Sequence, residues 1–122
     1  MSNRASHLHQ NLEALREPLN GIAREIEQAG LEGVRVEESR SGALNLFVGR
    51  QALHSRYDPE REARDLAGRI LEGSRPPKAV VLIGAGMGYI AEDIRRRDSD
   101  LPLIVVEPDV RVARAAMQAR DL

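Results

Sequence analysis

The sequence of 122 residues contains no cysteine, which excludes disulfide bonds, thiolate catalysis and zinc sites built on cysteine. It also has no apolar run approaching the roughly 20 residues that cross a bilayer. The opening, MSNRASHLHQ, lacks the apolar core of a secretory signal. A formal net charge of −1 provides no overall attraction to nucleic acid or anionic lipid. We therefore expect a cytoplasmic protein with neither nucleic acid nor membrane as partner.

The first thirty residues have the pattern of an amphipathic helix. Apolar residues recur there at every third or fourth position: Leu8, Leu12, Leu15, Leu19, Ile22, Ile26 and Ala29. Pro18 interrupts this pattern, because an interior proline removes a backbone donor and clashes with the preceding turn. We predict two helical pieces, with Pro18 opening the second and Gly30 capping its end.

Residues 33–49, GVRVEESRSGALNLFVG, have the pattern of a β-hairpin. Val34 and Val36 alternate with charged residues before the SRSG turn, and alternation resumes from Leu44 to Val48. Two period-two runs around a turn predict antiparallel strands with one solvated face.

A second helix is predicted to start in YDPERE. Asp58 can accept hydrogen bonds from the first-turn amides, Pro59 fits the first helical position, and Glu60 complements the helix dipole. The helix should end near Gly73. Its apolar stripe consists of Ala63, Leu66, Ala67, Ile70 and Leu71.

The remainder alternates between strand and helix. We predict strands over 79–83 and 103–107, and helices over 88–97 and 109–120. This βαβα order requires a parallel pair with a right-handed crossover. The fold class is therefore α/β. Residues 1–50 form a helical segment plus β-hairpin, and 51–122 form a Rossmann-like βαβα part of the same domain, with a partial parallel sheet. Two parallel strands leave edges uncovered, so we expect a homo-oligomer or a covering domain.

The turn after the first parallel strand contains three glycines, Gly84, Gly86 and Gly88, in the spacing GxGxG. The dinucleotide fingerprint needs GxGxxG or a closing alanine, and position 89 is tyrosine. The spacing instead resembles the first motif of class I methyltransferases, which use S-adenosylmethionine. In that hypothesis Glu107, at the end of the next strand, binds the ribose hydroxyls, although Leu82 replaces the acid usual before the first glycine.

The same residues allow a purely structural interpretation. The glycines would form a tight strand-to-helix turn, and Glu107 would cap the helix opened by Pro108. The sequence therefore identifies no particular cofactor. The candidate cofactor-binding residues are Gly84, Gly86, Gly88 and Glu107.

Other chemistry-bearing residues have simpler explanations. His7 and His9 form HxH without a third ligand nearby, and the Arg95–Arg97 run falls where a helix ends and cations are favoured. We expect His54 to be solvent-exposed or to cap a helix rather than to act as a base. Asp58 and Asp109 both stand at helix starts. We assign no catalytic residue and no metal ligand.

Three segments together resemble one family: LHSRYDPEREA at 53–63, VVLIGAGMGYI at 80–90 and IVVEPDVRVARAA at 104–116. The chain resembles the N-terminal region of the motility-associated factor (Maf) glycosyltransferases over roughly residues 11–118. Ile90 stands where members often carry histidine.

The resemblance implies a bacterial enzyme that transfers a nonulosonic acid from a CMP-sugar to Ser or Thr of flagellin. It also implies a catalytic centre in a central domain outside these residues, so we expect no catalysis by this chain alone. Its partners would be flagellin or the remainder of a larger chain. The alternatives are a methyltransferase-like module that binds S-adenosylmethionine and a non-catalytic scaffold with an empty turn.

Overall fold

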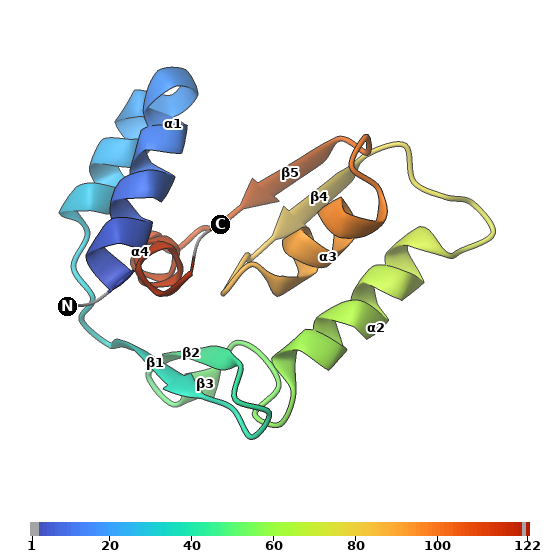
Figure 1. The fold of residues 1–122 in the computed structure, drawn as a ribbon, viewed down its shortest axis with the longest axis horizontal. Helices are drawn as coiled ribbons and strands as arrows, with labels where there is room; N and C mark the ends of the chain where they lie inside the picture. The colour runs from blue at the N-terminus through green and yellow to red at the C-terminus, as the bar shows by residue number, and fades with distance from the viewer. Residues whose placement is uncertain (1–2, 121) are drawn as a thin grey trace.

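The computed structural model describes residues 3–120 and residue 122, and within them the α/β class is confirmed. Helix α1 (Asn3–Gln28) is followed by a three-stranded antiparallel sheet of β1 (Val34–Glu38), β2 (Leu44–Val48) and β3 (Gln51–Ala52). Helix α2 (Pro59–Leu71) then leads into the predicted βαβα unit. That unit contains β4 (Val80–Ile83), α3 (Tyr89–Arg97), β5 (Leu103–Val106) and α4 (Val110–Ala119). Figure 1 shows α4 between α1 and the remaining elements.

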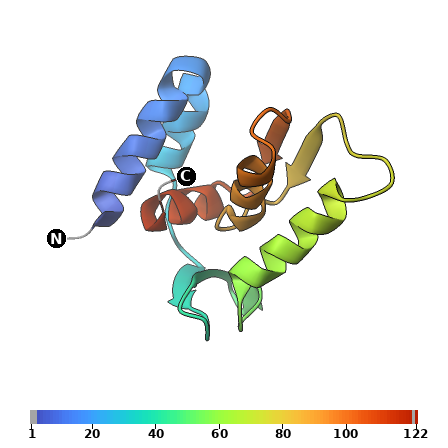
Figure 2. The same cartoon turned by 45° about the vertical axis from the view of Figure 1, so that its right-hand side comes forward.

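Helix α1 spans Asn3–Gln28 as one helix, where the sequence predicted two pieces. Figures 1 and 2 show its path reversing near the middle, so that its halves lie side by side. Leu12 shares a core cluster with Ile26, although a straight helix would hold them about 21 Å apart. Pro18, near the middle of this span, has no N–H to donate to the intrahelical hydrogen bonds, which weakens the helix there. Gly30 does not adopt the left-handed conformation of a helix cap, so that prediction is wrong.

The hairpin is confirmed, with Val34 opposite Val48 and Val36 opposite Leu46. Its turn ends at Gly42, whose φ of +92° favours glycine. Strand β3, a two-residue pairing with β2, was not predicted. The expectation of one solvated face holds only for β1. In β2 three consecutive residues are buried, including the polar Asn45, because later segments cover its second face.

Helix α2 begins as the sequence predicts. The Asp58 side chain accepts a hydrogen bond from the backbone N–H of Arg61 at 3.0 Å, and Pro59 occupies the first turn. The helix ends at Leu71, two residues before Gly73. Its buried alanines, Ala63 and Ala67, face α3 and the parallel sheet, so α2 holds the N-terminal hairpin and the βαβα unit together.

Strands β4 and β5 are parallel, as predicted, with Val80 beside Leu103 and Ile83 beside Val106. Helix α3 covers one face, where Ile94 is fully buried with Val80 and Leu101. Helix α4 leaves the sheet and packs between α1 and the hairpin. Among the described residues, none of the helices is both long and apolar enough to span a membrane.

Helix α4 is joined to α1 by a buried asparagine. The side-chain amide of Asn11 donates to the carbonyl oxygens of Met117 and Arg120, both at 3.0 Å. These are carbonyls at the end of α4 that have no intrahelical partner. One polar side chain on α1 therefore satisfies the last turn of a helix more than 100 residues later.

Candidate functional site

The glycine turn, residues 84–88, connects the end of β4 to the start of α3. Its three glycines have φ values of +86°, +54° and +86°, which side chains with a Cβ rarely adopt. A Cβ on Gly84 would meet no atom within 4 Å, whereas one on Gly88 would lie 2.9 Å from Leu122. Gly84 is therefore the one open glycine of this turn, and Gly86 and Gly88 face protein atoms.

Each backbone N–H of the glycine turn has an acceptor within the chain. The N–H of Gly84 donates to Val106 O at 2.7 Å, continuing the parallel sheet, and that of Gly88 donates to Ala85 O at 3.0 Å. The N–H groups of residues 85 and 86 donate to Glu107, and that of residue 87 donates to His54. The donors that would face a phosphate in a nucleotide-binding turn are occupied by two side chains.

Glu107 connects the ends of the two parallel strands. One carboxylate oxygen accepts from the N–H groups of Ala85 and Gly86 at 3.0 and 3.2 Å, and the other accepts from Asp109 N–H at 3.0 Å. The expectation that Glu107 caps α4 is wrong. The cap is Asp109, as its place in the sequence indicated, because its side chain accepts from Arg111 N–H at the first turn. The Arg111 guanidinium also lowers the pKa of Asp109 by hydrogen bonding.

His54 is the second side chain that holds the glycine turn. Its Nε2 accepts from Met87 N–H at 2.9 Å, and a Cβ on Gly86 would lie 2.4 Å from the same nitrogen. The side chain is only 7% exposed, so the expected exposed or capping position is wrong. The imidazole ring is held in this buried position by its hydrogen bond with the backbone N–H of Met87, 33 residues later in the chain.

The protonation of His54 suits an acceptor. Burial lowers the pKa of His54 below its ordinary value, opposed by the carboxylate of Glu62 and assisted by the charge of Arg120. The neutral ring accepts at Nε2 and carries its proton on Nδ1, which lies 3.9 Å from Glu62 Oε1. His54 therefore acts as a neutral structural clamp in this fold.

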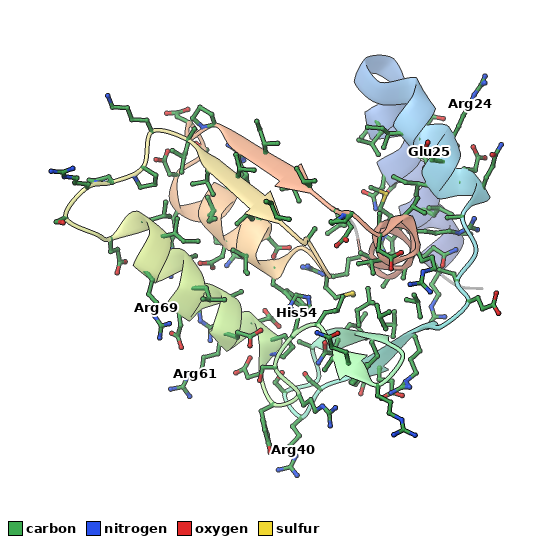
Figure 3. The ribbon with its side chains drawn as sticks, turned by 180° about the vertical axis from the view of Figure 1, so that it is seen from behind. Arg24, Glu25, Arg40, His54, Arg61 and Arg69 are labelled. Carbon is green, nitrogen blue, oxygen red and sulfur yellow. The ribbon has the colours of Figure 1, made fainter. Side chains whose placement is uncertain are left out.

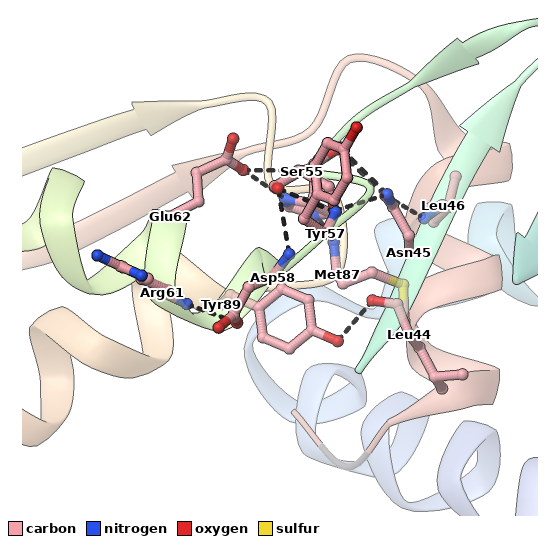
Figure 4. Close-up of polar contacts among 11 residues, drawn as sticks. Leu44, Asn45, Leu46, Ser55, Tyr57, Asp58, Arg61, Glu62, Met87 and Tyr89 are labelled. Atoms are coloured by element: carbon pink, nitrogen blue, oxygen red, sulfur yellow. Dashed lines mark hydrogen bonds and ion pairs between the residues drawn. The ribbon is translucent and has the colours of Figure 1, made fainter. Parts of the chain in front are cut away.

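Asn45, fully buried on β2, positions the segment that carries His54. Its amide nitrogen donates to the carbonyl oxygens of His54 and Ser55, both at 3.1 Å. Its carbonyl oxygen accepts from the backbone N–H of Leu46 and of His54 at 2.8 and 3.2 Å. Figure 4 shows this amide between the strand and the loop. We refer to Asn45, His54 and Glu107 as the turn clamp.

Tyr89 and Arg120 close the side of the turn clamp next to α4. The Tyr89 hydroxyl donates to Leu44 O at 2.6 Å, and its ring lies edge-on to His54 with the centroids 5.3 Å apart. Burial raises the pKa of Tyr89, opposed chiefly by Arg120, whose guanidinium lies 4.3 Å from the ring centroid. The same guanidinium donates to Met87 O and pairs with Glu92. These contacts bury Met87 completely.

The remaining residues singled out in the sequence lie apart from the turn clamp. Leu82 packs in the core beneath α3, and Ile90 is half-buried between two core clusters. His7 and His9 lie on helix α1 and not on a strand. On a helix, residues two apart do not share a face. Within the described part of the chain, no three His, Asp or Glu side chains are grouped to hold a metal ion.

The Arg95–Arg97 run at the end of α3 is engaged within the chain. Arg95 donates to the carbonyl oxygens of Ser99 and Leu101, and Arg96 and Arg97 both pair with the buried Asp93. These guanidiniums therefore form hydrogen bonds and ion pairs with groups in and just after α3.

An open depression of about 480 Å³ lies along α2, and no residue of the glycine turn lines it. Its lining combines three carboxylates with two arginines, and Tyr57, 64% exposed, stands in it with the Arg40 guanidinium 5.0 Å from its ring. The lining residues are Ser55, Tyr57, Asp58, Arg61, Glu62, Asp65, Leu66 and Arg69. The mixed charge selects no single ligand class.

These elements define an α/β protein in which a glycine turn is clamped by side chains from a hairpin, a loop and a neighbouring strand end. No protein-family model and no curated protein matches the sequence. Among solved structures, the chain is similar to a Maf glycosyltransferase from Magnetospirillum magneticum AMB-1, with a TM-score of 0.71 at 15% identity. The match covers 97% of this chain and 24% of that chain. The predicted resemblance is therefore confirmed at the level of the fold.

Proposed function

We propose that this chain is the N-terminal accessory domain of a motility-associated glycosyltransferase, acting in the bacterial cytoplasm. The resemblance implies transfer of a nonulosonic acid from a CMP-sugar to Ser or Thr of flagellin. The observation that carries the proposal is the structural match, in which almost the whole chain corresponds to about a quarter of a much longer Maf glycosyltransferase. The remaining three quarters of such a protein would provide the catalytic centre.

The turn clamp supports an accessory rather than a catalytic role. The five backbone N–H groups of the glycine turn are bonded within the chain, and Glu107, the candidate ribose ligand, accepts three of its neighbours' N–H groups. His54 is buried and neutral, with its acceptor nitrogen occupied. These groups stabilise the junction between the hairpin and the parallel sheet.

A nucleotide bound at Gly84, Gly86, Gly88 and Glu107 is the second part of the proposal. Gly84 has open space where a Cβ would be, so a ligand could approach the turn from that side. Binding there would require Glu107 to exchange a hydrogen bond from the turn for one from the ligand. We therefore expect weak binding of CMP or a CMP-sugar at most.

Thermal unfolding with CMP, a CMP-linked nonulosonic acid, S-adenosylmethionine and NAD tests both parts. A ligand at about 100 times its dissociation constant adds about 2.7 kcal/mol, or about 10 °C for a chain of this length. We expect shifts of no more than about 2 °C. The Glu107→Gln variant, which keeps one acceptor oxygen, should lose any CMP shift if Glu107 is a ligand.

Three outcomes would contradict the proposal. A shift near 10 °C with S-adenosylmethionine would favour the methyltransferase hypothesis. Glycosylated flagellin in a mass-spectrometric assay of the purified chain with flagellin and a CMP-linked nonulosonic acid would overturn the accessory role. No shift with any ligand, together with saturable flagellin binding in calorimetry, would favour the empty-turn scaffold.

A further inference from the structure

One face of the parallel sheet carries only aliphatic side chains and is exposed. The register places Val81 beside Ile104 and Ile83 beside Val106, on the face opposite α3. These four residues are 57%, 60%, 78% and 44% exposed. Figure 3, from behind, shows both strands in front of α3 with no other element crossing them. We call these four residues the open sheet face.

A parallel sheet with an exposed apolar face is an incomplete layer. Parallel strands are connected by crossover helices, and all-parallel sheets are covered on both faces in nearly all proteins that contain them. Here α3 covers most of one face, on which Val105 is still 43% exposed, and within the described residues the sheet contains only β4 and β5. The open sheet face has no charged or polar side chain that would bind a polar ligand or favour hydration.

The total exposed area indicates the size of the missing cover. The chain exposes 8029 Å², whereas a compact monomer of 13.5 kDa exposes about 6,500 Å². The excess of about 1,500 Å² is nearly twice the roughly 800 Å² that one partner buries in a standard protein–protein interface. The fold therefore leaves more surface uncovered than one standard interface would hide on this chain, and the open sheet face is one part of that surface.

We propose that the open sheet face binds an amphipathic helix from a further α/β segment, which extends the parallel sheet. The four-residue strands are about 13 Å long, which matches nine residues of helix. The nine-residue α3 covers the opposite face in the same way. The fold also occurs as a quarter of a longer chain, where such segments are available.

A second copy of this chain fits the open sheet face less well. Four small side chains per copy provide far less than the roughly 800 Å² per partner that a stable dimer buries. This inference rests on the proposed accessory role in one respect: the helix is taken to come from the larger protein of which this domain is a part. The nucleotide and flagellin assays test different residues, so their failure leaves the helix-binding experiment informative.

The test uses the whole chain with isoleucine and valine methyl groups labelled for NMR. The probe is a 14-residue helical peptide with leucines at i, i+3, i+4, i+7 and i+11 and with Lys and Glu elsewhere. We expect saturable shifts of the Val81, Ile83, Ile104 and Val106 methyl signals. A peptide of the same composition with its leucines spread around the helix should bind at least about tenfold more weakly.

Two variants provide matched controls. Ile83→Asp places a charge on the open sheet face at a site 78% exposed, so the fold is retained and binding should weaken at least about tenfold. Ile22→Asp introduces the same change at a 46% exposed site on α1 and should leave binding unchanged.

Equal binding of the two peptides, or methyl shifts outside the open sheet face, would overturn the proposal. Light scattering provides the second check. A stable dimer that Ile83→Asp dissociates, while Ile22→Asp does not, would assign the face to a second copy and would also overturn it.

Discussion

Replacing His54 with alanine tests whether the turn clamp stabilises the fold. The variant leaves the N–H of the fully buried Met87 without an acceptor, which costs about 1–3 kcal/mol. It also removes the edge-on contact with Tyr89, worth about 0.5–1.5 kcal/mol. We therefore expect the free energy of unfolding to fall by about 2–4 kcal/mol, a large part of the 5–15 kcal/mol typical of a domain.

The assays are urea unfolding, followed by circular dichroism, and calorimetry. A chain of 122 residues has an unfolding entropy near 0.26 kcal/mol/K, so each kcal/mol lowers Tm by about 4 °C. The expected drop is therefore about 8–16 °C. His54→Gln, which can offer an amide oxygen to Met87 N–H, should recover part of the loss. His9→Ala, on the exposed surface of α1, is the matched control.

A loss below about 0.5 kcal/mol in His54→Ala would refute this reasoning, because that is the range of neutral surface substitutions. Equal losses in His54→Ala and His54→Gln would instead show that the ring contacts, and not the hydrogen bond to Met87, provide the stabilisation.

Three further predictions follow from the same contacts. Gly86→Ala should destabilise the chain several kcal/mol more than Gly84→Ala in chemical denaturation, because both glycines have positive φ but only Gly86→Ala places a Cβ 2.4 Å from His54. The coupling energy between Gly86→Ala and His54→Ala, measured from the double variant, should exceed about 1 kcal/mol. Asn45→Leu should cost about 3 kcal/mol or more in the same assay, because it removes the partner of two part-buried carbonyls and of two N–H groups. A loss under about 1 kcal/mol would contradict the stabilising role of the turn clamp. The folded-state pKa of His54 lies below its unfolded value of 6.5, so the unfolded chain binds more protons and the free energy of unfolding should fall as pH drops below about 6.5. The contribution of His54 to this pH dependence should vanish in His54→Gln, and an unchanged slope in that variant would assign the dependence to other groups.

The local structure of this protein follows from short stretches of its sequence. Asp58 and Asp109 predict helix starts because a carboxylate beside free first-turn amides needs only neighbouring residues. Alternating valines and leucines around a Ser-Gly turn predict the hairpin in the same way. The strand–helix–strand order from β4 to β5 predicts the parallel pair, because a crossover helix returns the chain to the starting end of the sheet.

The helical conformation of α1 could be predicted from the sequence, but its path could not. Pro18 predicted two helical pieces, whereas in the structure one helix spans Asn3–Gln28 and its path reverses within that span. Packing decides it, since Leu12 from the first half and Ile26 from the second meet α4 in one cluster. A bend that brings both halves onto α4 buries more apolar surface than a straight helix could.

The turn clamp could not be derived from the sequence. A lone histidine, an asparagine on a strand and a glutamate after a strand each have several ordinary roles, and the partners that join them to other segments lie 9 to 33 residues away. His54 was expected at the surface for this reason. The only sequence signal was Gly86, whose missing side chain makes room for the ring, and a glycine does not reveal which neighbour occupies that room.

Apart from β3 and the path of α1, the sequence by itself determined the helix and strand segments, their order and the parallel pairing, because hydrogen bonds and apolar periodicity within a few residues specify them. Only the tertiary structure decided that Glu107 and His54 occupy the amides of the glycine turn and that one sheet face is exposed. The physical reason is that both depend on the relative positions of segments far apart in the chain. Such positions are set by the packing of the whole core, and a change of a few ångströms would make or break each contact.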